Sequence, residues 1–155
     1  MPAGPSRLIE AAYGGTSGLL PTTSTPVELD VPAQIKLTVT PRILPWRDTV
    51  TLRGHLAGGY VPADGVALRL LIRLPHRKRV YEPVPFRTNG AGTFRVRWSW
   101  GAGAGVASYS FAVATTSNES DYPYAAARSR WIRVTFGRAT PHHHRRHRAK
   151  HHRKR

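Results

Sequence analysis

Apolar and polar side chains alternate most clearly at residues 94–100. Phe94, Val96, Trp98 and Trp100 are separated by Arg95, Arg97 and Ser99. Because successive side chains of a strand point to opposite faces, this pattern predicts a half-buried strand of an antiparallel sheet. Just upstream, Asn89-Gly90 supplies two residues that tolerate the positive φ of a tight turn. We therefore expect residues 86–98 to form a β-hairpin.

The same type of pattern recurs along the chain and is punctuated by glycine and proline. Strand-like stretches lie at residues 35–40, 49–56, 66–74, 79–87, 93–100, 108–115 and 129–136. No long stretch carries apolar residues at helical spacing. About seven short strands within roughly 100 residues predict an all-β antiparallel sandwich.

The first 31 residues contain two further strand-like pieces, at residues 6–13 and 26–31. Two strands alone do not make a stable domain, so these pieces cannot be a module of their own. We therefore divide the chain into residues 1–31, the sandwich at 32–137, and a tail at 138–155.

The tail holds half of the net charge of +16, because it contains 8 of the 24 Lys and Arg residues and no carboxylate. It has almost nothing apolar to bury, so we expect it to stay disordered. Its cations would attract a polyanion, and its histidines are candidate metal ligands. The predicted polyanion contacts are Arg145, Arg146, Arg148, Lys150, Arg153, Lys154 and Arg155, and the predicted metal ligands are His142, His143, His144, His151 and His152.

Several chemistries are disfavoured by composition. The chain has no cysteine, which removes disulfides and thiolate sites. Outside the tail only His55 and His76 could act as bases, and we interpret both as surface groups. The run Gly101–Gly105 lacks the ending of a phosphate loop. Glu119 and Asp121, two residues apart, are the carboxylates considered as a calcium site. We expect no enzyme and no cofactor.

Aromatic residues offer a second kind of ligand contact, because exposed rings can stack on sugars. Trp98 and Trp100 share the inward phase of Phe94, which favours core packing. Trp131 has the opposite phase to its neighbours in the last strand, so we expect it outward, and near Arg95 or Arg97 if the two strands are neighbours. Tyr122 and Tyr124 occupy a loop at one end of the sandwich, where binding residues often lie. The predicted ligand contacts are therefore Tyr122, Tyr124 and Trp131.

One tyrosine has an expected structural role. Tyr109 stands at the start of the strand at 108–115, where a tyrosine corner donates a hydrogen bond to the backbone.

Several motifs resemble bacterial immunoglobulin-like (Ig-like) and carboxypeptidase-regulatory-like surface modules of secreted actinobacterial proteins. They are Gly54-His55-Leu56, the stretch Val61–Leu68, and Thr88-Asn89-Gly90-Ala91-Gly92-Thr93-Phe94. Ala12-Tyr13-Gly14-Gly15 and the stretch Ser24–Val31 resemble the last two strands of a preceding module of that kind. The chain departs from the pattern at Ala126-Ala127 and at Trp46-Arg47-Asp48, where glycine is usual.

The resemblance implies an Ig-like sandwich and a non-enzymatic structural or adhesive role in a secreted or cell-surface bacterial protein. Its partners would be neighbouring Ig-like modules and, through the tail, an anionic envelope polymer or another polyanion. The chain shows no transmembrane segment and no signal-peptide layout, so an export signal would lie outside it. Two alternatives remain: a nonspecific nucleic-acid or metal-binding protein that acts through its tail, and a carbohydrate-binding accessory domain.

Overall fold

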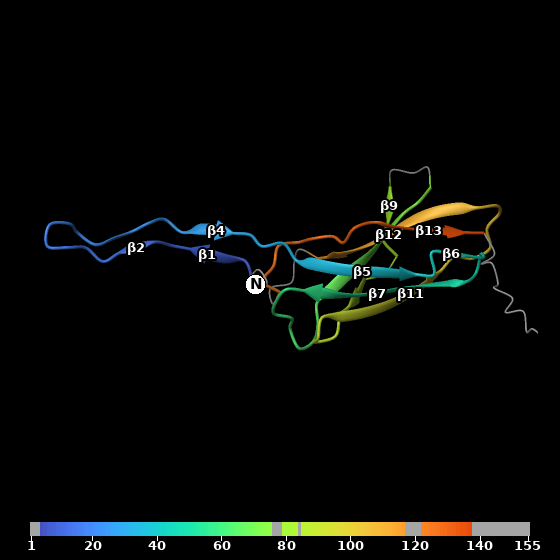
Figure 1. The fold of residues 1–155 in the computed structure, drawn as a ribbon, viewed down its shortest axis with the longest axis horizontal. Coiled ribbons are helices and arrows are strands. Elements are labelled where there is room, and N and C mark those ends of the chain that lie inside the picture. Colours follow the sequence, from blue (N-terminus) through green and yellow to red (C-terminus); the bar gives the residue numbers. More distant parts are fainter. Residues whose placement is uncertain (1–3, 76–78, 84, 117–121, 138–155) are drawn as a thin grey trace, which may run out of the picture.

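The computed structural model describes residues 4–75, 79–83, 85–116 and 122–137. This part of the chain forms two packed β-sheets and a long two-stranded arm that projects from one end (Figure 1). None of these residues is helical, so none belongs to a helix that could cross a membrane. The prediction of an all-β antiparallel sandwich is confirmed.

The first sheet has three antiparallel strands in the order β11-β7-β5. They are β5 (Gln34–Thr40), β7 (Thr49–Ala57) and β11 (Thr93–Ser99). Each alternates between buried and exposed side chains, so one face of this sheet covers the core and the other faces solvent.

The second sheet has the order β10-β8-β12-β13-β6, and β9 also pairs with β8. Its strands are β6 (Ile43–Leu44), β8 (Ala67–Arg73), β9 (Val80–Tyr81), β10 (Pro85–Arg87), β12 (Ala107–Thr115) and β13 (Ile132–Phe136). Only β6 and β13 run parallel. With β5-β7-β11 opposite, this strand order is that of an Ig-like sandwich.

The core lies between the two sheets and is made of aliphatic and aromatic side chains. Its largest fully buried members are Phe111, Phe136, Leu44, Leu52, Leu68, Leu70, Ile72, Val39, Val50, Val66, Val113 and Val134. Each such side chain stabilises the fold by roughly 1.5–3 kcal/mol before the entropy of ordering is counted. Gly54 allows the Phe94 ring to approach, because a Cβ at residue 54 would lie 2.5 Å from Phe94 Cζ.

The turn at Asn89-Gly90 is present, but the predicted hairpin is wrong. β10 pairs with β8 in the second sheet, whereas β11 pairs with β7 in the first. The turn therefore carries the chain across from one sheet to the other. Asn89 closes it, because its Oδ1 accepts hydrogen bonds from the backbone N–H groups of Ala91 and Thr93.

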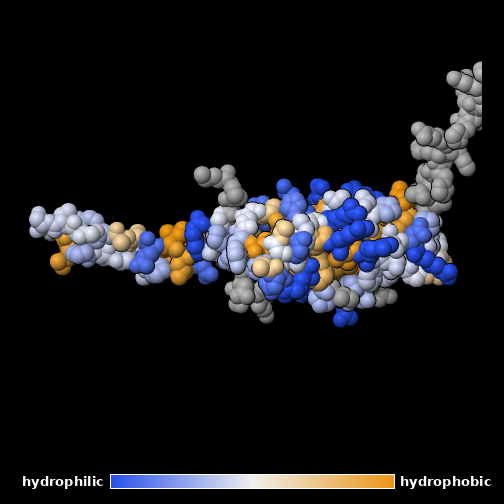
Figure 2. Space-filling view, turned by 90° about the horizontal axis from the view of Figure 1, so that it is seen from below, coloured by the Kyte–Doolittle hydropathy of each residue, from blue (hydrophilic) through white to orange (hydrophobic). Residues whose placement is uncertain are grey.

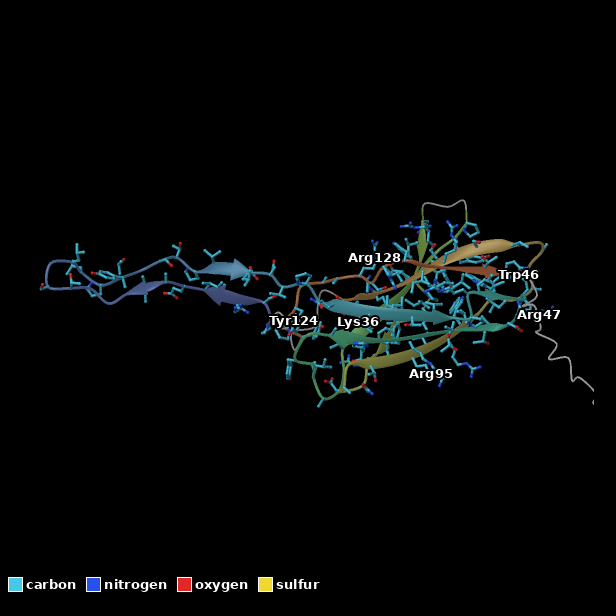
Figure 3. The ribbon with its side chains drawn as sticks, in the orientation of Figure 1. Lys36, Trp46, Arg47, Arg95, Tyr124 and Arg128 are labelled. Carbon is cyan, nitrogen blue, oxygen red and sulfur yellow. The ribbon has the colours of Figure 1, made fainter. Side chains whose placement is uncertain are left out.

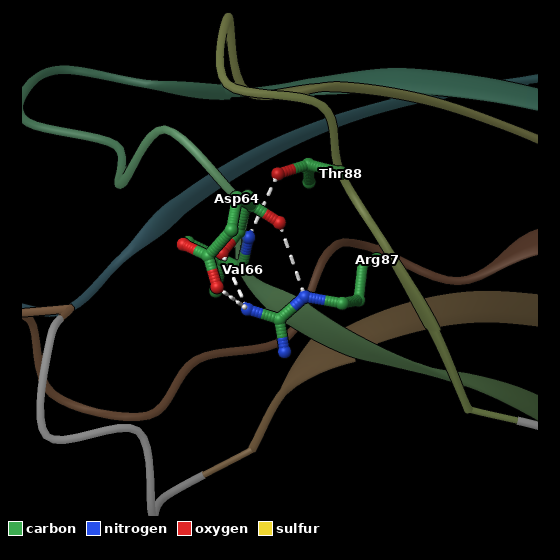
Figure 4. A network of polar contacts seen from close by, with 5 residues as sticks. Asp64, Val66, Arg87 and Thr88 are labelled. Atoms are coloured by element: carbon green, nitrogen blue, oxygen red, sulfur yellow. Dashed lines mark hydrogen bonds and ion pairs between the residues drawn. The ribbon is translucent and has the colours of Figure 1, made fainter.

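Side-chain bonds fix the start of this crossing (Figure 4). The buried hydroxyl of Thr88 accepts a 3.0 Å hydrogen bond from the backbone N–H of Val66. Next to it, the Arg87 guanidinium pairs with the Asp64 carboxylate at 3.1 Å. These partners attach the crossing to the turn before β8, so β10 stays in the second sheet.

The arm comprises residues 6–31 and consists of two short ladders. β1 (Arg7–Ile9) pairs with β4 (Val27–Leu29), and β2 (Ala12–Tyr13) pairs with β3 (Thr22–Thr23). All four strands are exposed, and hydrophobic side chains are visible on the arm in Figure 2. Leu20, near its tip, is 87% exposed.

Backbone hydrogen bonds join the base of the arm to the sandwich. Ser6 N–H donates to Pro123 O at 2.8 Å, and Ala125 N–H donates to Val31 O at 2.9 Å. Ala33 N–H, at the first sandwich strand, donates to Ala125 O at 3.0 Å. We call these contacts the junction. The arm and β5 are thus bonded to the same segment of chain.

The loop before β7 explains one departure from the Ig-like pattern. Arg47 has a φ of 73°, in the left-handed region where glycine is favoured. The neighbouring Trp46 holds the loop in place, because its Nε1 donates to Gly105 O at 2.8 Å and its ring stacks on Phe136 at 5.7 Å. Figure 3 shows both residues at the end of the sandwich far from the arm.

Candidate functional site

The outer side of the β5-β7-β11 sheet carries a group of basic side chains that we call the basic face: Lys36, Arg53, His55, Arg95 and Arg97. All five side chains are exposed. The strand register arranges them in rows, with Lys36 next to His55 and Arg53 opposite Arg95. Figure 3 labels Lys36 and Arg95 on this sheet, and Figure 2 shows hydrophilic side chains gathered over the sandwich.

The other outward positions of this sheet are small and polar. Among them are Thr38, Thr40, Thr51 and Thr93, and no Asp or Glu occurs in β5, β7 or β11. Arg130 lies beside the β5 edge, where it lines a shallow hollow together with Lys36 and His55. The surface is therefore of one sign and is rich in hydrogen-bond donors.

The charges of the basic face are not neutralised by other side chains of the described residues. No side chain in the set forms a hydrogen bond, ion pair or ring contact with another described residue. Arg53 and Arg95 form a direct cross-strand pair. Like charges in such a pair destabilise a sheet by a few tenths to about 1 kcal/mol. The arrangement thus costs stability and leaves the guanidinium donors of Arg53 and Arg95 available to an anion.

Trp131 lies on the other sheet and not near Arg95 or Arg97, contrary to the expectation. It comes just before β13, whose neighbours are β12 and β6. Its ring packs on Leu71, Ala112 and Ala114, and guanidinium groups lie 4.5 Å (Arg73) and 5.1 Å (Arg128) from the ring centroid. These cation–π contacts occupy the ring and hold the two arginines in place.

Tyr122 and Tyr124 belong to the junction. Tyr122 is only 7% exposed, and its ring lies 4.9 Å from that of Tyr124. The Tyr124 hydroxyl donates to Gly58 O at 3.1 Å. Burial, with a smaller effect of Tyr124, raises the pKa of Tyr122 to about 12. Tyr122 is thus buried beside Tyr124, and Tyr124 joins the arm side of the sandwich to the 58–59 loop.

Two tryptophans and a tyrosine form a structural cluster at the core. Trp98 and Trp100 pack against the core and contact each other at 5.4 Å. Tyr109 stacks on Trp100 at 4.7 Å, and burial raises its pKa. Its hydroxyl makes no hydrogen bond to the described residues, so the expected tyrosine corner is absent. The backbone carbonyl of Gly105 is instead held by Trp46.

Several predicted sites lie outside the described residues. These are the tail with all of its predicted polyanion and metal contacts, His76, Glu119 and Asp121. Among the residues that the structure does describe, no group of three or more His, Asp or Glu side chains could hold a metal ion. His55 is exposed and belongs to the basic face.

Sequence reasoning identified the outward phase of Arg95 and Arg97 but missed Lys36 and Arg53 as their neighbours. Alternation in residues 35–40 and 49–56 predicts that both point outward. Which strands lie side by side is decided by long-range pairing, and that pairing brings the four charges together.

Comparisons with known proteins do not identify a family for this chain. No family model matches the chain, and no curated protein matches it. Among solved structures, a superoxide reductase (neelaredoxin) from Ignicoccus hospitalis has 9% sequence identity and a TM-score of 0.42, over 67% of this chain and 81% of that chain.

Proposed function

We propose that this chain is a non-enzymatic, Ig-like structural or adhesive module of a secreted or envelope-associated bacterial protein. The observation that carries the proposal is the junction. Three backbone hydrogen bonds tie the arm and the first sandwich strand to residues 123–125. A sandwich that is bonded in this way to the element before it acts as a rigid spacer, not as a bead on a flexible linker.

The composition of the arm supports a neighbouring module as its partner. In the β1–β4 ladder, Ile9 lies opposite Val27, and Leu29 lies on the same side of the ribbon. Leu8 lies opposite Glu28, on the other side. Arg7 lies opposite Leu29, so this side of the ribbon carries three apolar side chains and one charge, and its apolar part fits the inner face of a further β-sheet.

Distances between spin labels test the rigid spacer directly. The chain has no cysteine, so Ser17→Cys near the arm tip and Thr93→Cys on β11 give a unique label pair. We expect a narrow distribution of distances between the labels. Ser6→Ala removes the oxygen that accepts the Val31 N–H bond at 2.9 Å and should broaden the distribution. A label pair within the sandwich, at Thr93 and Arg133, is the control that stays narrow in both proteins.

A broad distribution in the unaltered junction would refute the spacer. The result is independent of any ligand, so it does not depend on how the chain binds polyanions.

The tail is the proposed contact for an anionic envelope polymer. Its cations and the absence of carboxylates support this assignment. Binding to duplex DNA and to a cell-wall polymer, each titrated with salt, should be weaker for a chain that ends at Gly137 than for the full chain. Equal affinities of the two chains would show that the tail does not contribute to binding. Preferential binding of DNA would favour the nucleic-acid alternative.

A further inference from the structure

The outer faces of the two sheets differ in how their cations are used. On the second sheet, Arg69 pairs with Glu82 at 3.2 Å, and Arg73 and Arg128 contact Trp131, which leaves Arg133 on β13 without a partner among the described residues. On the first sheet, the side chains of the basic face have no partner among the described residues. The strongest unpaired positive surface of the described chain is therefore the β5-β7-β11 face.

We propose that the basic face is a docking surface for a linear phosphodiester polymer that lacks nucleobases. This assignment goes beyond the proposed contact of the tail, because it places a polyanion site on the folded sandwich itself. The polymer would lie across the three strands and contact Arg53, Arg95 and Arg97, with Lys36 at the β5 edge.

The chemistry of the face favours phosphate. Guanidinium groups bind phosphate oxygens in a bidentate manner, and threonine hydroxyls add neutral donors to the same oxygens. Arg95 and Arg97 lie two residues apart on β11, which spaces their Cα atoms by roughly 6.7 Å along the strand. Arg53 is about 5 Å from Arg95 across the ladder. A flexible chain with a charge at every repeat can contact several of these cations at once.

The same face argues against nucleic acid as the occupant. Proteins that bind single strands supply aromatic rings on which bases stack. No aromatic side chain occupies an outward position on β5, β7 or β11, because Phe94 and Trp98 point to the core side. The outer face of a three-stranded sheet also offers no element that enters a groove of a duplex.

The test compares two double variants of the full chain. Arg53→Thr with Arg95→Thr removes two charges from the basic face. Arg69→Thr with Arg133→Thr removes two charges from exposed positions on the second sheet and serves as the matched control. Threonine suits strands, so both variants should keep the fold, and circular dichroism and thermal unfolding verify this.

The probe is poly(glycerol phosphate), and affinity is measured over a range of salt concentrations. We expect the basic-face variant to bind about tenfold more weakly at low salt and the control to change less than about twofold. In a plot of the logarithm of the binding constant against the logarithm of the salt concentration, the slope should become smaller in magnitude by roughly 1.4–1.8 in the basic-face variant. Each lost phosphate contact contributes about 0.7–0.9 to that slope. Equal losses in the two variants would mean that net charge alone drives binding and would overturn the proposal.

Two further outcomes are decisive. Unchanged binding in both variants would assign all binding to other parts of the chain and would also overturn the proposal. Polygalacturonate and single-stranded oligothymidylate are the comparison ligands. If either binds as tightly as poly(glycerol phosphate) and loses as much affinity in the basic-face variant, the assignment to a phosphodiester polymer without bases is wrong.

Discussion

Arg53 and Arg95 lie directly opposite each other on β7 and β11, with both side chains exposed on the outer face of the sheet. Their mutual repulsion lowers the stability of the sandwich. Replacing either residue by threonine should raise the free energy of unfolding by about 0.2–1 kcal/mol, measured by urea denaturation. Arg133→Thr, which removes a charge without a directly opposite cation, should have a smaller effect. Lower stability in both Arg53→Thr and Arg95→Thr would show that the pair is not under repulsion.

Glycine at residue 47 should make the protein more stable than arginine does. The φ of 73° at Arg47 costs an L-residue roughly 1–2 kcal/mol, and glycine removes this strain. Part of the stabilisation is offset because glycine increases the conformational entropy of the unfolded chain. We expect Arg47→Gly to raise the free energy of unfolding by about 0.5–1 kcal/mol in chemical denaturation. Arg42→Gly in the preceding loop, where φ is not positive, is the control and should be neutral or destabilising.

Gly59 is required by Tyr124. A Cβ at residue 59 would overlap the Tyr124 hydroxyl, so the tyrosine would have to leave its place. Gly59→Ala should therefore destabilise the protein by about 1–3 kcal/mol and broaden the spin-label distances across the junction. Gly14→Ala, where a Cβ meets nothing within 4 Å, is the matched substitution and should leave both measurements unchanged.

Tyr122 should make stability depend on pH in the alkaline range. Its pKa of about 12 in the folded protein lies above the ordinary value of 10. The unfolded chain therefore loses this proton first, and stability that is present below pH 10 is lost between pH 10 and 12. Tyr122→Phe should show a shallower fall in the free energy of unfolding over that range. Ultraviolet titration should show the same number of phenols ionising near pH 10 in Tyr122→Phe as in the unaltered protein, because Tyr122 ionises above that range.

Most of the fold could be predicted from the sequence because its signals are local. The strand expected at 35–40 occurs as β5 at 34–40, and that expected at 93–100 occurs as β11 at 93–99. The segment expected at 79–87 is divided into β9 and β10, with Pro83 between them. Alternation and turn residues set such boundaries without reference to distant parts of the chain.

What could not be predicted depends on long-range pairing. The turn at Asn89-Gly90 is compatible with a hairpin or with a crossing between sheets, and the bonds of Thr88 and Arg87 to residues 64–66 decide for the crossing. The outward phase of Trp131 could be predicted, but its proximity to Arg95 or Arg97 depended on the two strands being neighbours, and β13 and β11 belong to different sheets. Tyr122 is buried because the segment 31–33 pairs with Ala125, which no local pattern indicates.

We propose that the folded sandwich contacts a phosphate polymer through its β5-β7-β11 face. The most direct measurement is the change in backbone amide chemical shifts of the full chain on titration with poly(glycerol phosphate). Docking on this face should give the largest changes at Lys36, Arg53, Arg95 and Arg97, with small changes on β12 and β13. Changes confined to residues 138–155, or spread equally over both sheets, would contradict it.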